Sequence, residues 1–311
     1  MKVYPLLLKP PIKDYLWGGT RLIDEFGFET DKSIAAEGWM LSCHKDGTNT
    51  VINGEYAGMG FDEVLKLLGY NDKFPVLIKL IDAKQKLSVQ VHPNDTYALA
   101  NEGEYGKTEM WYVVDCVEGA KLAYGFNKNI DKTEFEKRIT ENTHDDVINY
   151  VPVKKGDIFF IEAGTLHAIG EGILIAEVQQ NSNTTYRVSD YGRLGADGKP
   201  RELHVAKALE VTKCEVPKMP YGNVGNVKNT ANWRERRLAN CEYFKTTKLD
   251  LHGVKHIHRE KSWASLLILD GDVLIEYSND KFIAHKGDSI FIPQKCKTKI
   301  SGNAELIVTT C

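Results

Sequence analysis

No two of the six cysteines lie close enough together to predict a disulfide framework or a cysteine metal site. They occupy positions 43, 116, 214, 241, 296 and 311 without a CxxC motif, which is typical of reduced thiols inside a cell. No apolar run approaches the roughly 18 residues that a membrane-spanning helix needs. The first residues offer only three leucines before a lysine and two prolines, which does not indicate a signal peptide. We therefore expect a cytoplasmic protein with no membrane partner.

A strong charge of either sign is also absent. The formal net charge is -3, and the charged and hydrophobic fractions of 27% and 42% are ordinary for a globular protein. Such a balance gives no electrostatic footprint for nucleic acid, so an anion site has to be a local cluster of basic residues. A chain of 311 residues usually forms about two domains of roughly 150 residues each.

Helical patterns are scarce, and extended patterns dominate. Residues 131–141 begin with a capping box, Asp131-x-x-Glu134, and the other helical segments are 62–68 and 202–212. Short extended segments separated by Gly, Asp, Asn and Pro are predicted at 76–81, 87–92, 110–114, 121–125, 157–161 and 173–179. This pattern predicts a mainly β fold, a barrel or sandwich rather than a doubly wound sheet.

Valines alternate with polar residues in the segment 88–93, with the sequence Ser-Val-Gln-Val-His-Pro. Because side chains alternate across a strand, Ser88, Gln90 and His92 should point in one direction. The same alternation in Lys107-Thr-Glu-Met-Trp111 places Lys107 and Glu109 on a common face.

A third polar group follows a Gly-Asp-hydrophobic run and ends at His167, within Gly164-Thr-Leu-His167. One glutamine, two histidines and one glutamate form a plausible nitrogen and oxygen ligand set for a divalent metal such as zinc. We therefore expect Gln90, His92, Glu109 and His167 to surround a metal ion.

Parts of the chain are repeated. Lys155–His167 aligns with Lys286–Thr298, Gln90-Val-His92 with His256-Ile-His258, and Trp111–Cys116 with Leu266–Gly271. A repeat of this size predicts two related barrels. In the second copy Thr298 replaces His167 and Ala264 replaces Glu109, so we expect that barrel to serve packing or an interface.

The His-x-His, Gly-Asp and Gly-Thr-x-His pattern resembles the cupin superfamily of jelly-roll barrels. Within it, the chain resembles the short bacterial form of the type I mannose-6-phosphate isomerases. Only residues 110–166 separate Glu109 from His167, too few for the helical domain that longer relatives insert. The resemblance extends from about residue 5 to residue 213 and depends on five segments in order: 15–19, 87–95, 106–111, 163–170 and 179–191.

That resemblance implies two cupin-type jelly-roll barrels with a few short helices. Residues 1–225 would form the catalytic barrel with short helical insertions, and 226–311 a degenerate barrel without a metal site. It further implies one zinc ion per chain, held by His92, Glu109 and His167 with Gln90 as the fourth ligand.

The implied reaction interconverts mannose 6-phosphate and fructose 6-phosphate through a cis-enediol, with a small-molecule sugar phosphate as the partner. Arg187 is implied to be catalytic, and Lys107 is a candidate proton carrier because a nearby cation favours its neutral amine. A zinc-bound group or a bound water is the alternative carrier.

Arg193 is assigned to the substrate phosphate because a guanidinium matches phosphate oxygens, with Ser88 beside it. Trp17 is assigned to substrate contact, with core packing as its alternative.

Two other function classes remain open. A cupin oxygenase would use similar ligands with a redox metal, but it has no evident use for Lys107 and an arginine pair. A non-catalytic sugar-phosphate sensor would keep the pocket and could dispense with the proton carrier. The sequence does not fix the oligomeric state.

Overall fold

The computed structural model describes residues 2–70, 73–195 and 198–311 and divides into two compact units. Unit 1 consists of Met1–Asp14, Thr20–Leu80 and Val224–Cys311, and unit 2 of Tyr15–Gly19 and Ile81–Asn223. The division expected from the sequence, 1–225 and 226–311, treats both domains as continuous segments. The structure groups the N-terminal segments with the C-terminal one, because strand β1 (Leu6–Lys9) pairs with β22 (Ser289–Ile292).

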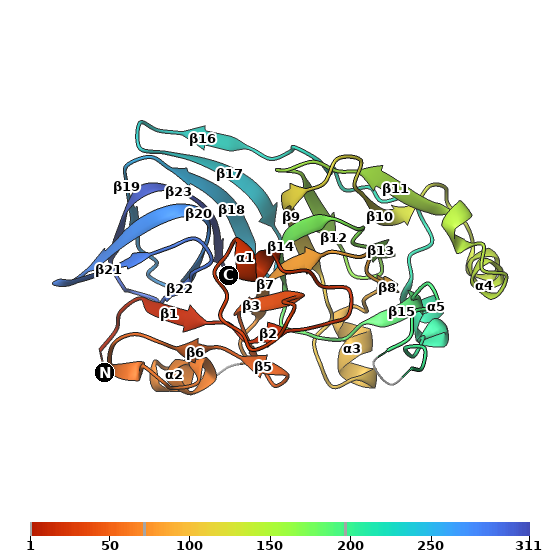
Figure 1. Cartoon of the computed structure of the whole chain (residues 1–311), viewed down its shortest axis with the longest axis horizontal. Helices are drawn as coiled ribbons and strands as arrows, with labels where there is room; N and C mark the ends of the chain where they lie inside the picture. The colour runs from red at the N-terminus through yellow and green to blue at the C-terminus, as the bar shows by residue number, and fades with distance from the viewer. Residues whose placement is uncertain (1, 71–72, 196–197) are drawn as a thin grey trace. The chain divides into compact units, whose positions relative to one another are not determined.

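Unit 1 is built around an antiparallel sheet in which β17, β18, β23 and β20 are successive neighbours (Figure 1). Its apolar core includes Leu249, Leu266 and Ile290, all fully buried. Besides β1 and β22, its elements are β2 (Ile12–Lys13), α1 (Arg21–Asp24), β3 (Glu37–Leu41), β4 (Cys43–His44), β5 (Gly47–Thr48), β6 (Thr50–Val51), η1 (Gly54–Tyr56), α2 (Phe61–Leu67), β16 (Val227–Asn229), β17 (Trp233–Asn240), β18 (Lys245–Leu251), β19 (Val254–Ile257), β20 (Ala264–Tyr277), β21 (Asp280–Ala284) and β23 (Thr298–Thr310).

Strand β7 (Val76–Ala83) continues from unit 1 into unit 2. The other elements of unit 2 are β8 (Val89–Val91), α3 (Asp95–Asn101), β9 (Glu109–Cys116), β10 (Lys121–Phe126), α4 (Lys132–Thr140), η2 (His144–Asp146), β11 (Ile148–Pro152), β12 (Ile158–Ile161), β13 (His167–Ala168), β14 (Ile173–Gln180), β15 (Tyr186–Ser189) and α5 (Val205–Val211).

Two groups of antiparallel strands form unit 2. One sheet has the order β11, β10, β13, β8, β15, and in the other group β9 lies between β12 and β14 (Figure 1). Val89 and Val91 pack in a buried cluster with Phe135 of α4 and Ala208 of α5. The helices therefore cover the valine face of β8, and its polar face is left to the opposite side of the sheet.

The mainly β prediction with few short helices is confirmed. Each of the six predicted extended segments overlaps a strand, and the three predicted helical segments correspond to α2, α4 and α5. The N-cap part of the predicted capping box is confirmed at the start of α4, because the Asp131 side chain accepts a hydrogen bond of 2.7 Å from the Glu134 amide. Among the described helices, none is long and apolar enough to cross a membrane.

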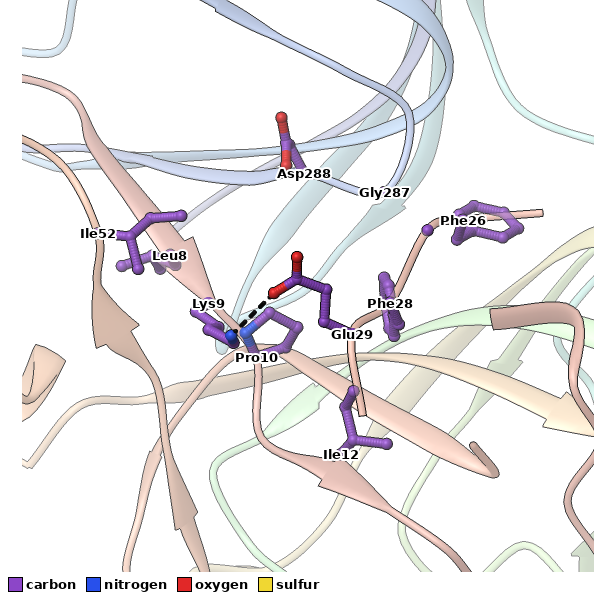
Figure 2. A pocket seen from close by; sticks show the side chains of 11 residues that line it. Leu8, Lys9, Pro10, Ile12, Phe26, Phe28, Glu29, Ile52, Gly287 and Asp288 are labelled. Carbon is purple, nitrogen blue, oxygen red and sulfur yellow. Dashed lines mark hydrogen bonds and ion pairs between the residues drawn. The ribbon is translucent and has the colours of Figure 1, made fainter. Parts of the chain in front are cut away.

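Unit 1 also contains a pocket of about 340 Å³ (Figure 2). Apolar side chains of Leu8, Ile12 and Phe28 contribute to its wall, and an ion pair of 3.2 Å joins Lys9 to Glu29 among the lining residues. Histidine is not among the lining residues that the structure describes, so this pocket does not provide the expected metal ligands.

Candidate active site

A row of polar side chains crosses the sheet formed by β10, β13, β8 and β15. Tyr124 lies opposite His167, His167 opposite Gln90, and Gln90 opposite Arg187. Directly opposed residues of antiparallel strands project to the same face. The backbone register thus places His167, a predicted metal ligand, on one side of Gln90 and Arg187, the predicted catalytic arginine, on the other.

The strands β12, β9 and β14 contribute a second row. Glu109 lies opposite Ile161 on one side and Gln179 on the other, and all three residues are almost completely buried. Two residues along, Trp111 lies opposite Glu177. The Trp111 indole donates a 2.8 Å hydrogen bond to the Glu177 carboxylate, which fixes both side chains.

His92, Glu109 and His167 form a buried cluster whose ligand atoms all lie within 4.8 Å of one another. The Glu109 carboxylate oxygens lie 3.6 Å from His92 Nε2 and 3.4 Å from His167 Nε2. The structure brings together three of the four predicted ligands, although they come from separate segments of the chain.

Backbone carbonyl groups fix the orientation of both imidazoles. His92 Nδ1 lies 2.9 Å from the Thr184 oxygen, and His167 Nδ1 lies 2.8 Å from the Thr165 oxygen. Because a carbonyl only accepts, each Nδ1 carries the proton, and each Nε2 presents a lone pair to the cluster. Burial also lowers the pKa of His167 to about 4, so its imidazole is neutral at neutral pH.

This arrangement fits a cation. The two Nε2 atoms are only 3.1 Å apart, and two lone pairs at that distance repel each other unless a positive charge lies between them. Neutral imidazoles held by Nδ1 hydrogen bonds, together with a carboxylate, are a common donor set for divalent metals. Gln90 is half-buried and adjacent in register to His167, so its role as the fourth ligand stays a prediction.

The turn before His167 is tied to the first ligand. The Gly164 amide donates a 2.8 Å hydrogen bond to the His92 carbonyl, and Gly164 has a φ of +90°. A side chain there would be strained and would also approach the Val211 oxygen to 2.9 Å. The Gly-Thr-x-His motif therefore holds the two histidine segments together.

Lys107 reaches the same cluster from the segment before β9. Its Nζ lies 3.2 Å from Glu109 Oε2 and 4.0 Å from Glu177 Oε1, and the side chain is buried. Glu177 was not among the residues predicted for the site. The available signal was a glutamate within the otherwise apolar segment Ile173–Val178, which has no reason to be buried unless it has a partner.

The predicted substrate contacts have different surroundings. Ser88 is buried directly before β8, and Arg187 is half-buried and donates a 2.7 Å hydrogen bond to the Glu202 carbonyl. Arg193 lies on the loop after β15 and donates to the Lys86 carbonyl.

Trp17 is 4% exposed, and its ring centroid is 5.7 Å from that of Tyr15. Its role as a substrate contact stays a prediction.

The second copy of the repeat requires one correction. Tyr277, Thr298 and Ile257 form the row that corresponds to Tyr124, His167 and Gln90. Gln90 therefore corresponds to Ile257, and aligning it with His256 was wrong by one residue.

A shift of one residue moves a side chain to the other face of a strand. Accordingly, Ile257 is buried, and His256 is exposed opposite Lys299. By the same register His92 corresponds to Arg259. The corrected alignment replaces all four ligand positions: Ile257, Arg259, Ala264 and Thr298.

His256 is exposed and His258 is half-buried, and neither lies at a position that corresponds to a ligand of the first barrel, which leads to a prediction. Replacing both by alanine should leave the metal content near one ion per chain and the activity little changed. Metal analysis and steady-state rates of the double variant test this. Loss of one metal equivalent would show that these imidazoles hold an ion.

Two groups of antiparallel strands around a buried His-Glu-His cluster define a cupin-like unit with a candidate metal site. Residues 6–114 match the family model "Phosphomannose isomerase type I, catalytic domain", and residues 234–311 match "Mannose-6-phosphate isomerase, cupin domain". The chain belongs to the type I mannose-6-phosphate isomerase family.

Full-length relatives support this assignment. The chain is 39% identical to mannose-6-phosphate isomerase ManA of Bacillus subtilis over 99% of both chains. It is 35% identical to mannose-6-phosphate isomerase of Streptococcus mutans over 98% of both. A crystal structure of mannose 6-phosphate isomerase from Bacillus subtilis superimposes with a TM-score of 0.90 at 36% identity, covering 98% of this chain and 99% of that one.

Proposed function

We propose that this chain interconverts mannose 6-phosphate and fructose 6-phosphate through a cis-enediol. The observation that carries the proposal is the buried His92, Glu109 and His167 cluster, with Lys107 3.2 Å from Glu109. The substrate is inferred from the names of the relatives, which are mannose-6-phosphate isomerases. The site contains groups suited to moving a proton between adjacent carbons. An assay that couples fructose 6-phosphate formation to a second enzyme tests the proposal. Absence of turnover in metal-loaded protein would contradict it.

Zinc is the metal that we propose for this centre, with Gln90 as the fourth ligand. When bound, zinc would supply a positive charge that stabilises developing enediolate oxygens without adding redox chemistry. His92 and His167 would direct neutral Nε2 atoms to it, because their Nδ1 protons are engaged by backbone carbonyls.

Lys107 is the proton carrier that we propose. It is buried between two carboxylates, those of Glu109 and Glu177, within the polar cluster where the proton would have to move. Arg187, next to Gln90 in the strand register, would stabilise negative charge as the enediolate forms. The substrate would enter with its C1 and C2 end toward these groups.

The rest of the substrate would contact Ser88, Trp17 and Arg193. We propose that unit 2 carries the reaction and that the C-terminal barrel serves packing, since its ligand positions are replaced. We also place the protein in the cytoplasm. All six cysteines lie in the described residues and carry thiols rather than disulfides, in keeping with a reducing compartment.

Replacing Arg193 by alanine should raise KM for mannose 6-phosphate by about 10- to 100-fold, the range expected when a charge-assisted hydrogen bond is lost. The value of kcat should change little, because a phosphate contact is made equally in the ground and transition states. Steady-state kinetics separate the two constants. A lower kcat at unchanged KM would contradict the assignment of Arg193 to the phosphate site.

A further inference from the structure

Asp190, on the loop after β15, is the centre of an arginine cluster. Arg201 binds it in a bidentate manner, with Nε 2.7 Å from Oδ2 and Nη2 2.6 Å from Oδ1. Arg193 donates to the same Oδ1 through its Nη2. The Asp190 side chain is 4% exposed, so the carboxylate is available chiefly to these two guanidiniums.

The cluster carries more positive than negative charge. Arg187 is close enough to Arg201 and Arg193 that their charges, after burial, contribute to lowering its pKa. Three guanidiniums and one carboxylate leave a formal charge of +2. The Glu202 carboxylate, which also interacts with Arg187, has a side chain that is 83% exposed and is screened by solvent.

Two donors of the cluster lack an acceptor. The Nε atoms of Arg187 and Arg193 are buried without a hydrogen-bond partner among the described residues. Buried donors are usually satisfied, and an unpaired donor in a native structure indicates a missing ligand or water. The net positive charge of Arg193 and Arg201 around one carboxylate, beside the unpaired Arg193 N–H, fits a phosphate with several acceptor oxygens.

We propose that Arg201 is a second contact to the substrate phosphate and that Asp190 is a positioning residue that orients Arg193 and Arg201 as a pair. This inference depends on the proposed function for the identity of the substrate, but the anion site itself does not. Arg193 is anchored twice, at Asp190 and at the Lys86 carbonyl, so its guanidinium is held in one orientation. Arg201 is held by two hydrogen bonds to one carboxylate, and its side chain remains 24% exposed for a ligand.

The test uses titration calorimetry with inorganic phosphate and steady-state kinetics with mannose 6-phosphate. Arg201→Ala should weaken phosphate binding and raise KM by about tenfold each, with kcat within about twofold. Arg201→Lys should restore part of the affinity, since it keeps the charge but loses the fork. Asp190→Asn should raise KM through both arginines while metal content stays at the wild-type level.

The exposed Arg234 in unit 1 provides the matched control. Arg234→Ala should change neither the affinity for phosphate nor KM for mannose 6-phosphate. A role confined to stability would lower the melting temperature of the Arg201 and Asp190 variants without a selective change in KM or phosphate affinity. Unchanged phosphate affinity and KM in Arg201→Ala would overturn the inference. Arg201-dependent phosphate binding in a wild-type protein that does not isomerise the sugar would instead support the site and contradict the proposed reaction.

Discussion

Replacing His167 by alanine is expected to abolish both metal retention and turnover. His167 is completely buried, and its Nε2 lies 3.4 Å from Glu109 and 3.1 Å from His92 Nε2. Alanine removes one of the donors that converge in the cluster. Only one imidazole, that of His92, would then remain beside the Glu109 carboxylate and the proposed Gln90 ligand, which weakens the binding of a divalent metal. Metal analysis after dialysis, together with the isomerase rate, measures both effects.

A second buried histidine of unit 2 provides the control. His144 is 5% exposed and lies outside the cluster, so His144→Ala creates a comparable loss of buried volume. That variant should keep one metal ion per chain even if its stability falls. If His167→Ala retained a full equivalent of metal and wild-type activity, the ligand assignment would be wrong.

Arg187→Ala is expected to lower kcat by about 100-fold and to affect KM much less. Removal of one preorganised donor to a developing oxyanion typically costs about 10²- to 10³-fold in kcat. Arg187 is placed for this role by its position opposite Gln90, and its guanidinium is anchored at the Glu202 carbonyl. Steady-state kinetics with both sugar phosphates measure the effect.

Arg187→Lys provides the comparison, because it keeps the charge and loses the planar fork. It should recover part of kcat. If Arg187→Ala kept kcat within a few-fold and changed only KM, Arg187 would be a binding residue and its catalytic assignment would fail.

Local sequence patterns predicted the strands β7, β8, β9, β10, β12 and β14 and the cluster of His92, Glu109 and His167. The alternation from Ser88 to His92 was informative because valines on one face pack under α4 and α5, which leaves the polar residues on the other face. Glu109 and His167 were identifiable from the same period-two alternation and from the Gly-Thr-x-His motif. These patterns involve residues close together in the sequence, so they can be recognised without knowledge of the tertiary structure.

The features that depend on strand pairing could not be read in this way. His256 and His258 resemble the first-barrel motif in sequence, but the register of β19 against β23 places Ile257 at the position of Gln90 and leaves His256 exposed opposite Lys299. The pairing of β1 with β22 joins residues 281 to 285 positions apart in the sequence, and no local pattern predicts it. Arg201 became evident only when the structure brought it to Asp190.

The most direct measurement of the central claim is the rate of fructose 6-phosphate formation before chelation, after chelation and after addition of zinc. A metal held by His92, Glu109 and His167 predicts that activity falls to background when the protein is metal-free and returns as zinc approaches one equivalent per chain. The His167→Ala variant should show no recovery. Full activity in a demonstrably metal-free sample would contradict the account.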